Sequence, residues 1–118
     1  MRIVLADDLT IAIKDAFPVS PGHSLIIPKR HIGSFFEITP DEQKAMFNMV
    51  WRMKGLVHTE FQPDGYNIGI NDGEAAGQTV MHLHLHLIPR YRGDHSDPRG
   101  GIRWIIPEKA DYWTDRNR

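Results

Sequence analysis

The feature that most constrains the fold is an alternating run in the second half of the chain. Residues 79–88 read TVMHLHLHLI. Because successive side chains of a β-strand point to opposite faces, this run predicts a strand with one apolar face and one histidine face. The apolar face comprises Met81, Leu83, Leu85 and Leu87, and the histidine face comprises His82, His84 and His86. The apolar face is expected to pack on a core, which leaves the histidine face for chemistry.

Three histidines spaced in this way favour an extended ligand over a single metal ion. Neighbouring histidines on one strand face lie roughly 6.6 Å apart at their roots, and the outer two are about twice as far apart. A metal ion would reach two of them only with ligands from elsewhere in the chain. Imidazole titrates near neutral pH, so the row can supply a neutral nucleophile and charged donors together. This combination predicts phosphoryl or nucleotidyl transfer at the middle histidine.

Apolar alternation predicts further strands on both sides of this run. Strands are expected at residues 9–15, 23–27 and 66–71, and a short one at residues 102–106. A turn is expected between the first two, at the proline- and glycine-containing residues 17–22.

One long helix is predicted between these strands. Thr39 can cap its first turn, Pro40 suits the first helical position, and Glu42 completes a capping box. The helix is expected to run to about Phe61 and to stop at the QPDG sequence of residues 62–65. Its apolar stripe, which is expected to lie on the sheet, consists of Met46, Met49, Val50, Met53, Leu56 and Val57.

Composition narrows the possible functions. A chain of 118 residues with 25% charged and 41% hydrophobic residues predicts one globular domain, residues 1–118. Its formal net charge of -1 disfavours a long nucleic acid as partner but allows a small anionic ligand. The absence of cysteine excludes disulfides and sulfur-ligated zinc. Since no segment approaches the ~20 apolar residues of a membrane span, a cytoplasmic protein without membrane contact is expected.

These residues resemble the histidine triad (HIT) family, in which three histidines alternate with hydrophobic residues. The heptad HLHLHLI at residues 82–88 carries the resemblance. Four further matches support it: Asp15, the Pro21-Gly22-His23 loop, Asn71, and the Gly77-Gln78-Thr79 segment. The resemblance implies an α+β fold with a mainly antiparallel five-stranded sheet and one long helix packed on it. It also implies a homodimer.

The activity that the resemblance implies is hydrolysis of a nucleotide. A nucleoside monophosphate, such as AMP, would be released from a dinucleoside polyphosphate or a nucleoside phosphoramidate through a covalent nucleotidyl-histidine intermediate. By matched position His84 is the nucleophile, and His86 binds the phosphate and helps to protonate the leaving group. His82 and His23 orient and tune the site. Neither a metal nor another cofactor is expected, because these groups would replace Lewis-acid assistance.

The remaining matched positions are expected to bind the small nucleotide substrate. Asp15 would accept hydrogen bonds from the ribose hydroxyls, and Ile13 and Leu25 would either enclose the base or belong to the ordinary core of the sheet. Gln78 and Thr79 would either donate to phosphate oxygens or form a polar loop that caps the strand. Asn71 and Gly77 would also bind the nucleotide. The sequence Ile88-Pro89-Arg90 is similar to the dinucleoside-polyphosphate hydrolase branch of the family.

Several alternatives remain open from the sequence. Four arginines, Arg90, Arg92, Arg99 and Arg103, either contact a polyphosphate or form a solvated surface. Trp104 and Trp113 either stack on a second base or lie at a dimer interface. The protein would otherwise be a nucleotide sensor with little turnover, or a metal-binding protein that uses His82, His84 and His23.

Overall fold

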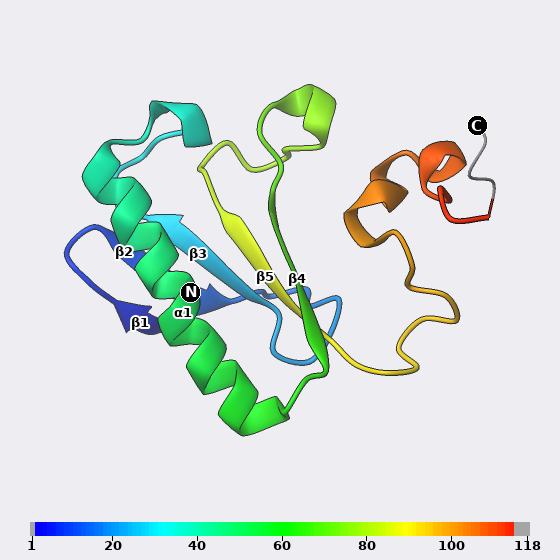
Figure 1. The fold of residues 1–118 in the computed structure, drawn as a ribbon. Helices are drawn as coiled ribbons and strands as arrows, with labels where there is room; N and C mark the ends of the chain where they lie inside the picture. Colours follow the sequence, from blue (N-terminus) through cyan, green and yellow to red (C-terminus); the bar gives the residue numbers. More distant parts are fainter. Residues whose placement is uncertain (1, 115–118) are drawn as a thin grey trace.

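The long helix follows the local sequence signals closely. The structure is a computed structural model that describes residues 2–114. Helix α1 (Pro40–Phe61) begins at the Thr39 cap, with both hydrogen bonds of the capping box present, and ends at Gln62, which adopts a left-handed conformation. Five of the six residues predicted for its apolar stripe are buried, but Leu56 is 45% exposed, so its inclusion was wrong. The other five belong to the hydrophobic core. Figure 1 shows α1 lying across one face of the sheet.

Five antiparallel strands form a single sheet beneath this helix. They are β1 (Ile3–Ala6), β2 (Thr10–Lys14), β3 (Ser24–Pro28), β4 (Gly65–Ile70) and β5 (Leu85–Arg90). Their order in the sheet is β1-β2-β3-β5-β4, so the histidine-bearing strand lies between β3 and β4. The predicted α+β fold, with a five-stranded antiparallel sheet and one long helix, is confirmed. The first strand was not predicted, because its four residues are all apolar and show no alternation.

The strand predicted at residues 79–88 is correct only in its second half. Residues 79–84 are irregular, and β5 begins at Leu85. The pairing of β3 with β5 stops at the Ile26–Leu85 pair. Pro28, two residues further along β3, has no N–H to extend this ladder. Met81 consequently leaves the apolar face and is 52% exposed, whereas Leu83, Leu85 and Leu87 are buried as predicted.

The predicted strand at residues 102–106 is absent. The segment instead forms two short 3₁₀ helices, η3 (Gly101–Ile105) and η4 (Pro107–Lys109). Gly100 and Gly101 both have positive φ, which turns the chain into a helix rather than a strand. The chain ends in the polar sequence DRNR at residues 115–118, which predicts a frayed end; these residues lie outside the part that the structure describes. In Figure 1 the segment that contains η3 and η4 lies beyond β4, on the side away from β1.

The two faces of the sheet differ in a way that positions the candidate site. Thr10 and Ala12 of β2 are fully buried, with Ala12 in the core that α1 covers. Ile11 and Ile13 therefore point to the opposite face, which none of the helices described between residues 2 and 114 covers over β2 and β3. Two short helices, η1 (Phe35–Glu37) and η2 (Glu74–Ala76), complete the described structure near one end of this face. No helix within residues 2–114 is both long enough and apolar enough to cross a membrane.

Candidate active site

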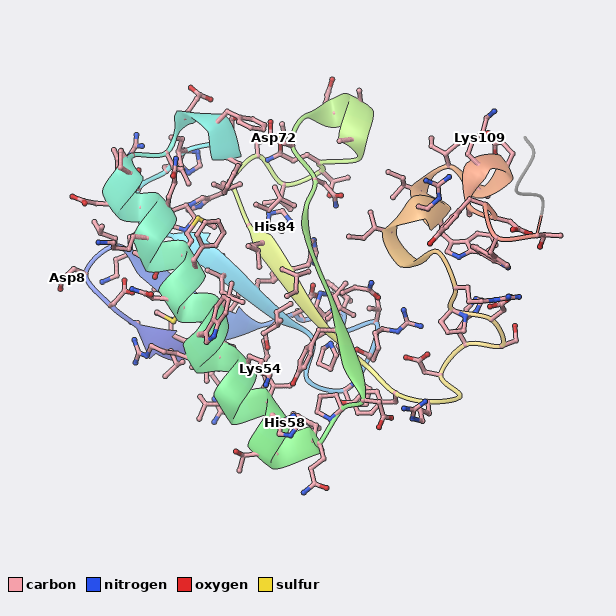
Figure 2. The ribbon with its side chains drawn as sticks, in the orientation of Figure 1. Asp8, Lys54, His58, Asp72, His84 and Lys109 are labelled. Atoms are coloured by element: carbon pink, nitrogen blue, oxygen red, sulfur yellow. The ribbon has the colours of Figure 1, made fainter. Side chains whose placement is uncertain are left out.

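The ring of His84 is held in one tautomer by the backbone. Its Nδ1 lies 2.9 Å from the carbonyl oxygen of His82. Because a carbonyl can only accept, Nδ1 carries a proton, so in the neutral ring Nε2 is the nitrogen with the free lone pair. Figure 2 shows His84 beside the start of β5. The geometry therefore presents Nε2 as an unprotonated nitrogen.

A backbone carbonyl also fixes the position of a proton on His82, but there the protonated nitrogen is Nε2. Its Nε2 donates to the carbonyl of Pro28 at 2.8 Å, and its ring packs against His31 with centroids 5.0 Å apart. His82 thus ties the irregular residues 79–84 to the end of β3. Its backbone carbonyl, which orients His84, is fixed by this attachment.

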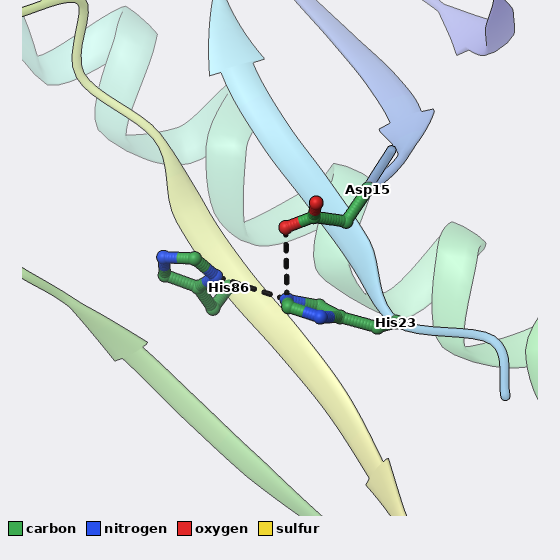
Figure 3. Close-up of side chains that lie close together, drawn as sticks. All are labelled: Asp15, His23 and His86. Atoms are coloured by element: carbon green, nitrogen blue, oxygen red, sulfur yellow. Dashed lines mark hydrogen bonds and ion pairs between the residues drawn. The ribbon is translucent and has the colours of Figure 1, made fainter. Parts of the chain in front are cut away.

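His86 belongs to a chain of three titratable groups, shown in Figure 3. His23 Nε2 lies 3.0 Å from His86 Nδ1 and 3.4 Å from a carboxylate oxygen of Asp15. The other His23 nitrogen, Nδ1, accepts the backbone N–H of Val19 at 3.2 Å, so the proton of neutral His23 is on Nε2. Donation from His23 to His86 Nδ1 leaves the His86 proton on Nε2, the nitrogen that points away from His23.

Burial sets the protonation states of the two histidines in this group, His23 and His86. Burial lowers the pKa of His86, the neighbouring His84 and His23 lower it further, and Asp15 opposes them. Burial also lowers the pKa of His23, again opposed by Asp15. Both rings are therefore neutral at pH 7, and Asp15 provides the charge that favours their protonated forms.

The contacts of Asp15, His23 and His86 fit a relay, in which protons shift between these groups, better than a metal site. Within residues 2–114, Asp15, His23 and His86 form the group whose ligand atoms lie close enough to share an ion, all within 4.8 Å. A histidine that ligates a metal through one nitrogen normally donates a proton from the other. His23 instead accepts at Nδ1 from Val19 and keeps its proton on the nitrogen that faces the cluster. The set proposed from the sequence, His82, His84 and His23, is not brought together.

An apolar cavity of about 500 Å³ adjoins His84 on the open face of the sheet. Ile13 and Leu25, expected to enclose a base, both line it. Its other walls are Ile3, Ile11, Ile27, Pro28, Lys29, Val80, His82 and His84. Ile11 and Ile27 were missed as site residues, although each shares a strand face with a residue that was identified. Ile3 was missed because β1 itself was missed. Because a nucleoside is proposed below to bind there, this cavity is called the nucleoside cavity.

Comparison with known proteins identifies the family. The sequence profile that describes the HIT domain matches residues 1–93. The chain belongs to the HIT family. It is 42% identical over 92 residues to Protein hit of Bacillus subtilis, covering 77% of this chain and 63% of that protein. It is 39% identical over 89 residues to the asymmetrical bis(5'-nucleosyl)-tetraphosphatase of Schizosaccharomyces pombe, covering 75% and 49%.

The fold of this HIT chain also matches solved structures. The crystal structure of a HIT family protein from Bacillus anthracis superimposes with a TM-score of 0.74 at 42% identity, covering 78% of this chain and 65% of that one. The chain thus spans less than two thirds of the length of these three proteins. The C-terminal tail beyond residue 93 lies outside the family match.

The loop before the triad of this HIT chain is organised by Gln78. Its amide oxygen accepts the Gly73 N–H at 2.8 Å, and its amide nitrogen donates to the carbonyls of Gly33 and Val80 at 3.0 and 3.1 Å. With these partners the buried Gln78 side chain holds the loop, rather than presenting a free donor. Thr79 is exposed, while Asn71 and Gly77 line a second cavity with His86.

The tail arginines have partners within the chain. Arg90 donates to Asp94 and Asn67, and Arg99 donates to Asp97. Arg103 donates to the backbone carbonyls of Lys109 and Ala110. These three guanidinium groups therefore stabilise the tail. The two tryptophans also pack within it: Trp104 donates to the Arg99 carbonyl, and the Trp113 ring lies 4.8 Å from the Arg99 guanidinium.

Proposed function

We propose that this chain is a nucleotide hydrolase that releases a nucleoside monophosphate, such as AMP, through a nucleotidyl-His84 intermediate. The substrate would be a dinucleoside polyphosphate or a nucleoside phosphoramidate. The observation that carries the proposal is the free Nε2 lone pair of His84 beside an apolar cavity that can accept a base. A neutral imidazole nitrogen is a good nucleophile toward phosphorus, and its attack splits one difficult hydrolysis into two displacements.

Substrate binding would use both sides of His84. The base would enter the nucleoside cavity between Ile13 and Leu25, where burial of its apolar faces favours binding. Asp15 accepts from the Phe17 N–H at 2.8 Å, and its carboxylate retains lone pairs for the ribose hydroxyls. Thr79, which follows the ordered Gln78, would donate to a phosphate oxygen.

The first displacement forms a bond from His84 Nε2 to phosphorus and breaks the bond to the leaving group. The anionic phosphate raises the proton affinity of the adjacent His86, which takes up a proton at Nδ1 while the His23 Nε2–H donates to Asp15 alone. The cationic His86 then donates its Nε2 proton to the leaving atom. His84 becomes cationic as the bond forms, and the His82 carbonyl stabilises that charge through Nδ1. In the second displacement water attacks phosphorus, its proton passes to neutral His86, and His84 leaves with its lone pair restored.

The family relationship supports this chemistry. The Schizosaccharomyces relative carries the name of a dinucleoside tetraphosphatase. A histidine at position 86 supports hydrolysis over nucleotidyl transfer, because the transferase branch of the superfamily carries glutamine at the corresponding position.

The experiment that tests the proposal measures AMP release from diadenosine tetraphosphate and from adenosine 5'-phosphoramidate in metal-free buffer. His84→Ala should lower kcat at least about 10³-fold, because it removes the nucleophile. His58→Ala is the matched control, since His58 lies exposed near the end of α1 (Figure 2). Mass spectrometry after an alkaline quench should detect one adenylyl group on the native chain and none on His84→Ala. Nucleotide binding without any AMP release would instead identify a sensor.

A further inference from the structure

The nucleoside cavity lies over two rungs of the sheet that carry only aliphatic side chains. In the pairing of β2 with β3, Ile13 is opposite Leu25 and Ile11 is opposite Ile27. All four side chains line the cavity. The two rungs are separated by two residues of each strand, or roughly 6.6 Å. A base lying along these rungs would bury apolar surface.

Polar residues follow the two apolar rungs at both ends. At one end the Asp15 N–H donates to the carbonyl of His23, which continues the β2–β3 pairing by one residue. This is the aspartate proposed above to bind the ribose. At the other end Lys29 comes two residues after Ile27, and its N–H donates to the carbonyl of Leu9. A nucleotide with its ribose at Asp15 would therefore direct the far edge of its base toward Lys29.

Lys29 brings a positive charge to the nucleoside cavity that no neighbour neutralises. Among the described residues that line this cavity, Lys29 has the one permanently charged side chain, and there is no carboxylate. Within residues 2–114 its exposed ammonium group makes no hydrogen bond or ion pair. An ammonium group has three donors and no acceptor. It is therefore available to a base that presents acceptors.

We infer that Lys29 selects nucleotides with a 6-oxopurine base, such as guanine or hypoxanthine, over nucleotides with adenine. The inference rests on the proposed function, because that function places the base in the nucleoside cavity. The edge of guanine presents two acceptors, O6 and N7, which one ammonium group can meet together. Adenine presents N7 beside an amino group, whose hydrogens would face the donors of Lys29. A purine is favoured over a pyrimidine because its larger base covers more of the apolar rungs.

Titration calorimetry of the native protein with IMP, GMP and AMP tests the selection without turnover. IMP carries O6 where AMP carries the amino group, so this pair isolates the contact proposed for Lys29. Both IMP and GMP should bind at least about tenfold more tightly than AMP, which is the discrimination expected of such a paired contact. Lys29→Met removes the charge but keeps a long unbranched side chain, and should abolish the difference. Lys29→Arg keeps the donors and should retain a preference for IMP.

The control and the contrary outcomes are distinct. Lys44→Met removes an exposed lysine of α1 outside the cavity and should preserve the preference for IMP. Native affinities that are equal or that favour AMP, or a preference that survives Lys29→Met, would overturn the inference. Equal weakening of AMP and IMP by Lys29→Met would also overturn it, because Lys29 would then contact the phosphate that both share. In each of these cases nucleotide still binds and the proposed hydrolase stands. If the native protein binds none of the three, both proposals fail.

Discussion

At the scale of single residues, backbone groups decide which nitrogen of each histidine carries a proton. The His82 carbonyl accepts from Nδ1 of His84, and the Val19 N–H forces the proton of neutral His23 onto Nε2. A histidine alternation cannot encode these assignments, because they depend on where the fold places main-chain N–H and carbonyl groups. The sequence therefore predicted which rings gather near the reaction centre, whereas their roles follow from hydrogen bonds that only the fold creates.

The contact between Asp15 and His23 predicts a shift in the pH profile. Asp15 raises the pKa of His86, so Asp15→Asn should lower it further. If His86 must be protonated, activity declines as pH rises through this pKa, and the declining limb of kcat/KM should move to lower pH in Asp15→Asn. The measurement is the pH dependence of AMP release between pH 5 and 8. Asp8→Asn, an exposed change in the β1–β2 turn, is the control and should leave the limb in place. An unmoved limb in Asp15→Asn would contradict the relay.

The role of Gln78 as a loop organiser gives a second prediction. Gln78→Glu keeps the oxygen that accepts from Gly73 but replaces the donor to the carbonyls of Gly33 and Val80 with another acceptor. The free energy of unfolding should fall by about 1–3 kcal/mol, since buried partners lose their hydrogen bonds. Urea unfolding measures the loss. Gln43→Glu, at an exposed helix position, should change stability by less than about 0.5 kcal/mol. Equal effects of the two changes would argue against the structural role.

At the scale of elements, prediction succeeded where the determining signals are local. Helix α1 was predicted from Thr39 to Phe61 because its cap, first turn and stop lie within the helix sequence itself. The start of β5 was not predicted correctly, because it depends on where the backbone pairing between β3 and β5 ends, near Pro28. The face assignment of β2 likewise required the position of α1. Its buried side carries Thr10 and Ala12, while the larger isoleucines line the nucleoside cavity.

The first turn of α1 gives an element-scale prediction about stability and pH. Glu42 accepts from the Thr39 N–H and from Arg30, whose hydrogen bond is the main reason that the pKa of Glu42 falls to about 2. The unfolded chain therefore takes up the proton first, and this stabilisation is lost as pH falls from the ordinary value of 4.5 toward 2. Glu42→Gln should cost about 1–3 kcal/mol at pH 7 and progressively less below pH 4.5.

Denaturant unfolding at pH 7, 4 and 2.5 measures this difference directly. Glu60→Gln is the control, because the Lys14–Glu60 pair is exposed on both sides and should contribute less than about 1 kcal/mol. A cost for Glu42→Gln that is the same at all three pH values would show that its charge is not what stabilises the turn.

At the scale of the whole molecule, we propose that a second copy of the chain would bind at the outer edge of β4. Within residues 2–114 no strand pairs with this edge. The flank of α1 beside it carries Phe47 and Trp51, which are 48% and 76% exposed. Lys54 on the same flank lies 5.9 Å from the ring centre of Tyr66 in β4, which shows that this flank faces the edge. An unpaired edge next to exposed aromatic side chains favours the homodimer expected from the sequence.

Trp51→Glu should therefore convert a dimer into a monomer. A two-fold axis at the β4 edge would pair the two copies of β4 and bring the aromatic flanks of both helices together, where a buried glutamate would have no partner. Size-exclusion chromatography with light scattering should give twice the monomer mass for the native chain and the monomer mass for the variant. Leu56→Glu, on the opposite flank of α1, should remain dimeric. If Leu56→Glu dissociates the dimer and Trp51→Glu does not, the two copies meet through the flank of α1 that faces away from β4.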